Sequence, residues 1–384
     1  MKKSRSGFPP LPAPGVSLPR LRRAARVAVE DVLRLKKGER VLIVTNPETD
    51  VLAVSRALYE ASARRDAEPL LLVQPRRTSL QFAADGVIHA LRSEPEAVLS
   101  ISADKLGKDR FGLERPYRFP GVEGSWEHIF NALLGARKSR SFWTPSITAD
   151  MFARTVPVDY QAMGVRAKAL KKVLDRAERV RITAPAGTDL EIGLAGRKAF
   201  LDDGAFWRPG RGGNLPAGEV FISPANYDAR GIVVFDGSLS TADGAGAFLP
   251  ARPVKAAVEG GLVTALEGGA GAKRLERSLA MGEEAARRMK GKKGWNSSRI
   301  ERYALHARHL GELGIGLNPK ARITGNMLED EKVLGTCHLA LGSNYDEDAQ
   351  AFIHLDCLVR SPTIETRGKR GPWRKILDQG RILA

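Results

Sequence analysis

The sequence predicts an α/β protein, in which an N-terminal α/β domain with a parallel sheet is followed by a β-rich α+β domain. Its 384 residues exceed what one hydrophobic core usually holds, so two domains are expected. In the first part of the chain, short apolar runs alternate with helical spacing, as in parallel βαβ units. In the second part, short strand patterns follow one another with turns between them. We therefore expect a division near residue 165.

The first elements of the chain support the α/β prediction. Residues 1–19 contain five prolines and little that can pack, which predicts a flexible leader. Apolar spacing from Leu21 to Leu35 predicts a helix that ends at Lys36–Gly38. The β-branched run Arg40–Thr45 then predicts a buried strand. The first domain is expected to cover residues 20–165.

A βαβ pattern continues from this first strand. Residues 51–61 carry apolar side chains on one helical face, and Pro69–Val73 and Ala97–Ser102 are typical of strands. Strand, helix and strand in this order predict a parallel sheet. No Gly-x-Gly-x-x-Gly motif follows the first strand and the sequence contains no phosphate-binding loop. Neither a Rossmann dinucleotide site nor a P-loop is therefore predicted.

The second domain, over residues 166–384, has a denser strand pattern. Residues 179–183 and 188–194 flank the turn Pro185-Ala186-Gly187 and predict a hairpin. A basic helical insert is expected near residues 271–294. Further strands are predicted at Gly218–Ile222, Gly231–Phe235, Leu262–Leu266, Thr336–Leu341 and Ala351–Leu358.

The composition excludes several classes of protein. Apolar residues make up 43% and charged residues 27%, which is typical of a globular chain and not of a disordered one. No apolar run approaches the roughly 18 residues of a membrane span. The N-terminus lacks the apolar segment of a signal peptide. We expect a cytoplasmic protein that does not associate with membranes.

The net charge of +17 is unusual and attracts anions. No helix-turn-helix, zinc finger or aromatic-rich RNA motif accompanies the basic residues, so a solvated basic surface is expected and not specific nucleic-acid binding. The two cysteines, Cys337 and Cys357, are too few for a disulfide framework or a four-thiolate zinc site. Strand parity predicts that both point into the core. The basic residues lie in separate patches, at 20–26, 64–77, 288–293 and 367–375.

Candidate metal ligands concentrate in the last part of the chain. Alternate side chains of a strand share a face, so His354 and Asp356 are expected to project together. If the strand that carries His338 is their neighbour, three ligands converge. Tyr345 follows in a turn, from which its phenol can lean over the same site. Imidazole and carboxylate groups placed in this way can hold a divalent metal ion.

Glu219 is a further candidate ligand. It enters a predicted strand just after a Pro/Gly loop, where a buried carboxylate without a partner is costly. A metal ion can supply that partner, and so can an arginine such as Arg208 or Arg211. Each of the ligand types named above, taken alone, is also compatible with a hydrogen-bonded structural role.

Four blocks of the sequence carry a family resemblance. They are FWTPSITADMFARTVPVDY (142–160), NLPAGEVFISP (214–224), ELGIGLNPKARITGNMLEDEKVLGTCHLALGSNY (312–345) and IHLD (353–356). In their order along the chain and in their residues, these blocks resemble the aminopeptidase T family of metallopeptidases. The resemblance spans about residues 21–365 and is strongest in the C-terminal half.

This resemblance implies both a fold and a metal site. In that family an N-terminal α/β domain is followed by a larger domain that holds two divalent metal ions, so zinc, cobalt or manganese is the expected cofactor. The similarity also implies a dimer or larger homo-oligomer. The implied metal ligands are Glu219, Glu312, His338, His354 and Asp356. The implied catalytic residue is Tyr345. Glu331, a nearby carboxylate, is a further catalytic candidate that the resemblance does not itself assign.

On this interpretation the protein is a hydrolase that removes N-terminal residues from peptides with metal-activated water. One or both of Glu219 and Glu312 bridge the metals. Tyr345 stabilises the tetrahedral oxyanion. Glu331 binds the free amino group of the substrate or transfers protons.

Two departures from the family pattern leave alternatives open. The segment between Glu219 and Glu312 is longer than in the peptidases and carries the basic insert, whereas the segment between Tyr345 and His354 is shorter. A reshaped pocket puts a peptide substrate in question and leaves room for another small molecule. It also leaves open a non-catalytic binding protein that has kept the fold.

The Gly-Leu-Asn-Pro sequence at residues 316–319 is similar to a divergent branch of the family that includes 2,5-dihydroxypyridine 5,6-dioxygenase. That enzyme uses one iron(II) ion held by two histidines and an aspartate, an arrangement typical of non-haem oxygenases. Tyr345 or Glu219 would then accept the proton of a ring hydroxyl. The glutamate at position 312 favours the two-metal site instead. The iron ligands would be His354, Asp356 and one of His306, His309 or His338.

Overall fold

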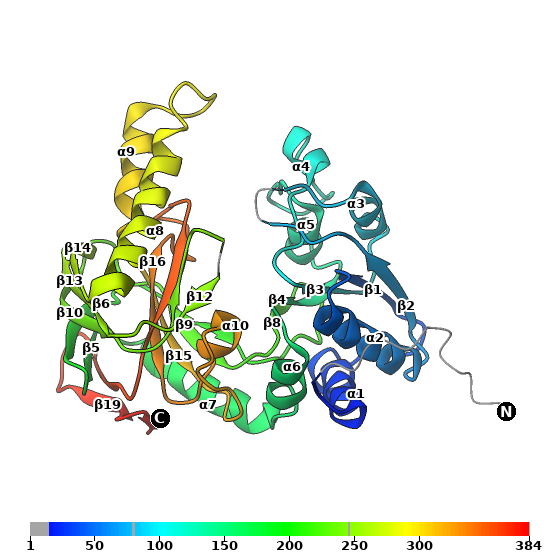
Figure 1. Cartoon of the computed structure of the whole chain (residues 1–384), viewed down its shortest axis with the longest axis horizontal. Coiled ribbons are helices and arrows are strands. Elements are labelled where there is room, and N and C mark those ends of the chain that lie inside the picture. The colour runs from blue at the N-terminus through cyan, green and yellow to red at the C-terminus, as the bar shows by residue number, and fades with distance from the viewer. Residues whose placement is uncertain (1–14, 79–80, 245, 384) are drawn as a thin grey trace. The chain divides into compact units, whose positions relative to one another are not determined.

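The chain folds into two compact units in the computed structural model, which describes residues 15–78, 81–244 and 246–383 (Figure 1). Unit 1 consists of Met1–Tyr160 and Gly204–Ala217, and unit 2 of Gln161–Asp203 and Gly218–Ala384. The predicted fold class is confirmed, because unit 1 is built on a parallel sheet and unit 2 on antiparallel sheets with helices. Residues 204–217, expected in the second domain, belong to unit 1 because a short strand within them joins its sheet.

Among the described residues, unit 1 has one parallel sheet with the strand order β2-β1-β3-β4-β8. The strands are β1 (Arg40–Thr45), β2 (Glu68–Val73), β3 (Ala97–Ser102), β4 (Arg140–Pro145) and β8 (Gly212–Asn214). The first three agree with the predicted strands to within one residue. The last two were not predicted. β4 mixes polar and aromatic residues, and β8 has the sequence Gly-Gly-Asn, so neither shows a strand pattern.

Helices connect the strands of unit 1. They are α1 (Leu18–Val27), the π-helix η1 (Ala28–Val32), α2 (Thr49–Ala63), α3 (Asp85–Leu91), α4 (Arg110–Glu114), α5 (Ile129–Gly135) and α6 (Ala149–Thr155). The leader predicted over residues 1–19 is too long, because α1 already begins at Leu18 and accepts Pro19 in its first turn. Residues 1–14 of that leader lie outside the described residues.

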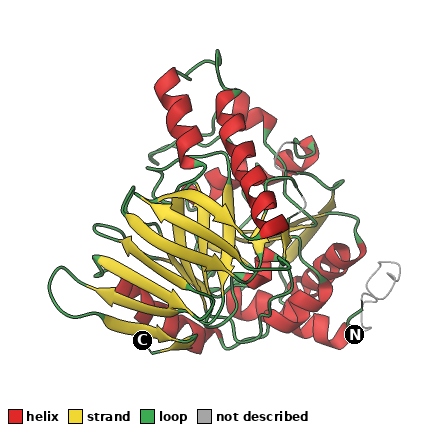
Figure 2. Cartoon of the chain, turned by 60° about the vertical axis from the view of Figure 1, so that its left-hand side comes forward, coloured by secondary structure: helices red, strands yellow, loops and turns green. Residues whose placement is uncertain are grey.

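Unit 2 contains two antiparallel sheets within the part of the chain that the structure describes (Figure 2, yellow). The first has the order β14-β13-β10-β6-β5-β18-β19-β20 and includes the predicted hairpin. Its strands are β5 (Arg179–Ala184), β6 (Thr188–Gly193), β10 (Ala229–Phe235), β13 (Val254–Glu259), β14 (Leu262–Glu267), β18 (Thr363–Arg367), β19 (Arg374–Asp378) and β20 (Arg381–Ile382).

The second sheet of unit 2 carries the candidate ligands, in the order β12-β11-β17-β16-β15-β9-β7. Its strands are β7 (Phe200–Asp202), β9 (Glu219–Ile222), β11 (Leu239–Ser240), β12 (Ala247–Phe248), β15 (Leu310–Gly316), β16 (Cys337–Gly342) and β17 (His354–Val359). Cys337 and Cys357 are buried, as parity predicted, and both are free thiols.

The helices of unit 2 are α7 (Tyr160–Leu174, whose first residue lies in unit 1), α8 (Gly269–Arg287), α9 (Ser297–His306) and α10 (Met327–Asp330). The basic insert predicted near residues 271–294 is α8 and the turn that follows it, and α9, which was not predicted, lies beside α8 (Figure 1). The chain turns at residues 288–296, and the side chain of Asn296 caps α9 by accepting a hydrogen bond from the Arg299 amide.

Among the described residues, no helix combines the length and apolarity needed to cross a bilayer.

Candidate metal centre

Four adjacent strands bring the predicted ligands to one face of the second sheet. Residues directly opposite in an antiparallel pair share a face, as do alternate residues of one strand. Glu312 on β15 lies opposite Ala340 on β16, which lies opposite Asp356 on β17. His338 is two residues before Ala340, and His354 is two before Asp356, so these four polar side chains share a face. On the other side of β15, β9 contributes Glu219 opposite Gly316.

The ligand atoms form two groups that share Glu312. In each group of three, one nitrogen or oxygen atom from every residue lies within 4.8 Å of the others. Oε1 of Glu312 is 3.1 Å from Nε2 of His338, while Oε2 is 3.4 Å from Nε2 of His354. The first group is Glu219, Glu312 and His338, and the second is Glu312, His354 and Asp356.

The orientation of the side chains leaves electron pairs directed into the cluster. Nδ1 of His354 lies 2.9 Å from the backbone oxygen of Ser343 and, as a donor to it, leaves Nε2 free to bind a cation. Within the described part of the chain, Oε2 of Glu219 and Oε2 of Glu312 accept no hydrogen bond, although both are buried. Buried polar atoms without partners are rare and costly. The donor set therefore fits divalent cations.

The charges in the cluster also favour cations. Burial lowers the pKa of His338, but its hydrogen bond to Glu312 and the charges of Glu219, Glu312 and Asp356 outweigh burial and raise the value to about 9. Burial also lowers the pKa of His354, but Asp356 and then Glu312 outweigh burial and raise it well above its usual value. Without metal, the carboxylates thus draw protons onto both imidazoles, and a bound cation would take the place of those protons.

Small residues make room for the ligands between the strands. Gly314 lies opposite His338, and a Cβ atom at that glycine would be 2.0 Å from Nε2 of the histidine. The imidazole therefore lies across β15 only because position 314 has no side chain. Ala340 similarly separates Glu312 from Asp356 with a single methyl group.

A buried lysine that the sequence analysis missed completes the cluster. Lys332, with its side chain 0% exposed, places Nζ 2.5 Å from Oε1 of Glu219, 2.8 Å from Glu331 and 3.2 Å from Asp202. The partner of Glu219 is thus this lysine, which the sequence analysis did not consider. The local sequence does not distinguish Lys332 from a lysine exposed at the surface. Two of the acids that pair with it lie on strands that are distant in the chain.

Burial raises the pKa of two acids around this lysine, although its positive charge lowers them. The value for Asp202 rises to about 7 and that for Glu331 to about 8. Asp202 lies opposite Glu219 in the β7–β9 pair, so the two carboxylates share a face and repel each other. Glu331, a predicted catalytic residue, therefore lies beside the ligands and is held by Lys332.

Tyr345 lies at the exposed side of the cluster. Its ring meets the His354 imidazole edge to face, with 5.4 Å between centroids. The residue as a whole is 54% exposed, so a substrate can reach it. Desolvation, followed by the charges of Glu312 and Asp356, raises the pKa of Tyr345, which therefore keeps its proton at neutral pH.

The two histidines proposed as alternative ligands lie in a different environment. Nε2 of His306 is 2.7 Å from the Tyr227 hydroxyl, and Nδ1 is 3.2 Å from the Gln350 backbone oxygen. Burial lowers the pKa of His309 to about 4, so its imidazole is neutral. Among the described residues, neither histidine belongs to the two ligand groups. Of the three histidines considered as a third iron ligand, His338 alone joins the cluster, and it does so through Glu312, which also belongs to the group of His354 and Asp356.

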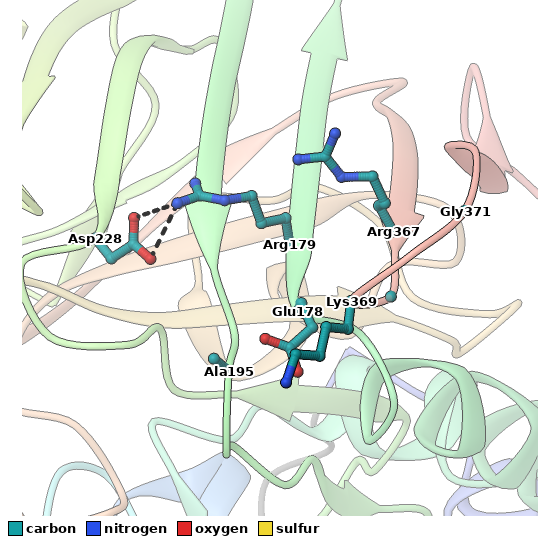
Figure 3. Close-up of a pocket in the computed structure, with 8 residues that line it drawn as sticks. Glu178, Arg179, Ala195, Asp228, Arg367, Lys369 and Gly371 are labelled. Atoms are coloured by element: carbon teal, nitrogen blue, oxygen red, sulfur yellow. Dashed lines mark hydrogen bonds and ion pairs between the residues drawn. The ribbon is translucent and has the colours of Figure 1, made fainter.

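A cavity of about 460 Å³ lies elsewhere in unit 2 (Figure 3). Arg179 lines it and is paired with Asp228, at 3.0 Å, and with Glu191, at 2.9 Å. Arg367 and Lys369 line it too. No ligand of the candidate metal centre lines this cavity, so it is separate from the chemistry considered below.

The fold and the cluster together define an α/β protein with a candidate metal centre of carboxylates and imidazoles. The family model described as 2,5-dihydroxypyridine 5,6-dioxygenase matches residues 146–365, which is more than half of the chain and includes every ligand named above. The protein belongs to this family.

Two solved structures share the fold. The 2,5-dihydroxypyridine dioxygenase from Pseudomonas putida KT2440 has 17% identity and a TM-score of 0.69, with 96% of this chain and 98% of that chain covered. Wild-type AmpT from Thermus thermophilus has 19% identity and a TM-score of 0.65, with 95% and 99% covered. No curated protein matches the sequence. The similarity to the two structures establishes the fold, and the chemistry has to be argued from the residues of this chain.

Proposed function

We propose that the protein is a two-metal hydrolase that removes N-terminal residues from peptides, in the manner of an aminopeptidase T. One observation carries this proposal, namely that the two oxygens of Glu312 face different histidines, 3.1 Å from His338 and 3.4 Å from His354. A carboxylate that presents one oxygen to each of two ligand groups would help to hold a cation in each of them. A single mononuclear ion would use only one of the groups.

The charge of the cluster supports two cations as well. Bound cations would lower the raised pKa values of Asp202 and Glu331. With both imidazoles neutral and all five acids ionised, five carboxylates and one ammonium carry four net negative charges, which two divalent ions balance and one does not. Buried charge without compensation is strongly unfavourable. The carboxylates are Asp202, Glu219, Glu312, Glu331 and Asp356, and the ammonium is that of Lys332.

Divalent ions held by these ligands would supply Lewis-acid polarisation of a carbonyl group and a water of lowered pKa. The chain's own residues would bind and orient the peptide. Tyr345 keeps its proton and is placed beside His354 to donate a hydrogen bond to the developing oxyanion. Glu331 would accept the substrate's terminal ammonium or transfer a proton, and Lys332 holds this carboxylate in place at 2.8 Å.

The family match favours a second candidate function, a ring-cleaving dioxygenase with one iron(II) ion. His338, His354 and Asp356 contain the two imidazoles and one carboxylate that such enzymes use. In this case Glu312 would be a fourth donor in the middle of the triad, since it lies within 3.4 Å of both histidines. That extra carboxylate is why we prefer the hydrolase.

Metal analysis of the purified protein and of Glu312→Gln tests the proposal. We expect about two equivalents of zinc, cobalt or manganese in the wild type, together with hydrolysis of leucine p-nitroanilide. The variant should bind metal about 100-fold more weakly or worse, since changes behind the ligands alone typically cost 10–100-fold. Calorimetric titration of the metal-free protein measures this without any turnover.

Glu259→Gln, at an exposed carboxylate on β13, is the matched control and should bind metal like the wild type. One equivalent of iron with oxygen uptake on 2,5-dihydroxypyridine would instead establish the second candidate. If no metal is bound, the remaining candidate is a non-catalytic binding protein that has kept the fold.

A further inference from the structure

Three aromatic side chains form a row that ends on the candidate metal centre. Phe200 and Phe221 are stacked, with 5.3 Å between ring centroids and 18° between planes. The Phe221 ring lies 4.9 Å from that of Tyr345, and Tyr345 lies 5.4 Å from the His354 imidazole. We call Phe200, Phe221 and Tyr345 the aromatic ledge. It connects a metal ligand to the edge of the sheet without interruption.

Strand register explains why the ledge faces the same way as the ligands. β7 and β9 pair so that Asp202 lies opposite Glu219 and Phe200 opposite Phe221. Phe221 is two residues after Glu219, so both project from one face. On its other side Phe221 lies opposite Gly314, which has no side chain to cover it. The carboxylates and the rings therefore form two adjacent rows on a single surface.

The ledge is unusually open for a row of aromatic residues. Phe200 is 39% exposed and Tyr345 is 54% exposed, although each would gain from burial against apolar atoms. Single exposed apolar residues need no explanation. Three rings in mutual contact, the last of which touches a candidate ligand, have the character of a substrate surface next to a reaction centre.

The position of the ledge selects its occupant. A group that reacts at the cluster lies beside His354, and its nearest apolar support is the Tyr345 ring followed by Phe221 and Phe200. Flat aromatic groups gain most from such a surface, through offset or edge-to-face contacts. In a peptide whose terminal ammonium faces the carboxylates, the part that can reach the ledge is the side chain of the first residue.

We propose that the aromatic ledge binds the side chain of the substrate's N-terminal residue and makes the enzyme prefer large apolar side chains, above all aromatic ones. This inference rests on the proposed hydrolase function. Phe200 and Phe221 take no part in bond cleavage, so the loss of either ring changes substrate preference and leaves the metal content unchanged.

Phe200→Ala and Phe221→Ala test the proposal, with phenylalanine and alanine p-nitroanilides as substrates. We expect each variant to lower kcat/KM for the phenylalanine substrate roughly tenfold, as the loss of one aromatic contact implies, and mostly through KM. The alanine substrate should change less than about twofold, because its methyl group does not reach the rings. Equilibrium binding of L-phenylalaninamide gives a second readout that does not depend on turnover.

Phe248→Ala is the matched control. This residue lies on β12, at the opposite edge of the same sheet, where the Arg274 guanidinium lies 4.4 Å from its ring centroid. It should leave the preference between the two substrates unchanged. Equal losses on both substrates in the ledge variants, with metal content intact, would overturn the proposal.

The experiment also separates the ledge from the proposed function. No hydrolysis of either substrate by the metal-loaded wild type would overturn both. Hydrolysis without a preference for phenylalanine over alanine would overturn the proposed role of the ledge but not the proposed hydrolase function. Tighter binding of 2,5-dihydroxypyridine than of L-phenylalaninamide, weakened in Phe221→Ala, would assign the ledge to a free ring and overturn its role for a peptide side chain.

Discussion

Gly314→Ala is expected to lower the affinity for metal by about 10- to 100-fold, although it adds only one methyl group. A Cβ atom at position 314 would lie 2.0 Å from Nε2 and 2.1 Å from Cε1 of His338. The histidine is 1% exposed, so its ring has no open space into which it can move. Either the imidazole leaves Glu312 or β15 shifts away from β16, and both results separate ligands that now lie 3.1 Å apart. Hydrolytic activity should fall at least as far, because misplacement of reacting groups by about 1 Å can cost 100-fold.

Gly164→Ala is the matched control for this substitution. Gly164 is a buried glycine inside α7, where an added Cβ would meet nothing closer than an Asp203 oxygen at 3.6 Å. Alanine is the better helix former, so this variant should be as stable as the wild type or more so, with normal metal binding. Titration of the metal-free proteins by calorimetry compares the two variants. Wild-type affinity in Gly314→Ala would show that His338 is not a ligand.

Sequence patterns alone could predict the part of the centre that depends on local parity. His354 and Asp356 lie two residues apart in a strand, and any β structure there places them on one face. The convergence with His338 required only that β16 and β17 be neighbours, which strands close in the chain usually are. The first strands of unit 1 could be predicted for a similar reason, because their apolar runs are continuous.

The remaining parts of the centre depend on pairings between distant segments. β15 has the sequence Leu-Gly-Glu-Leu-Gly-Ile-Gly, and because three of its residues are glycine it is not recognisable as a strand. Only the family resemblance therefore identified Glu312. Gly314 has to be a glycine because His338 lies opposite it on β16, and the sequence alone does not show which residue lies opposite. Lys332 meets Asp202 and Glu219 only after β7, β9 and the segment following α10 have come together. Long-range register, which local propensity does not specify, decides all three.

Lys332→Met is expected to destabilise unit 2 by about 3–5 kcal/mol, the usual cost of removing one partner from a buried ion cluster. The side chain is 0% exposed and its ammonium contacts three carboxylates. Methionine has a similar length but leaves those acids without a cation. A change of this size corresponds to a fall in Tm of roughly 6–20 °C for a unit of this length. Thermal unfolding of the metal-free proteins, followed by circular dichroism, measures it.

A surface lysine provides the comparison. Lys375 forms an ion pair with Asp378 at 3.0 Å, but their side chains are 48% and 44% exposed. Lys375→Met should therefore cost no more than about 1 kcal/mol. If Lys332→Met lowers the free energy of unfolding no more than this control does, burial of the three acids does not depend on the buried ammonium.

A triple variant separates the charge of Lys332 from its packing. Adding Glu331→Gln and Asp202→Asn to Lys332→Met removes two of the three acids that the lysine neutralises, so much of the lost stability should return if the charge is the cause. Metal affinity should not return with it. In the wild type, Nζ occupies Oε1 of Glu219 and leaves Oε2 facing His338 at 3.6 Å, and without the ammonium this carboxylate is free to rotate away. Recovered folding with weakened metal binding would therefore identify Lys332 as the residue that orients Glu219.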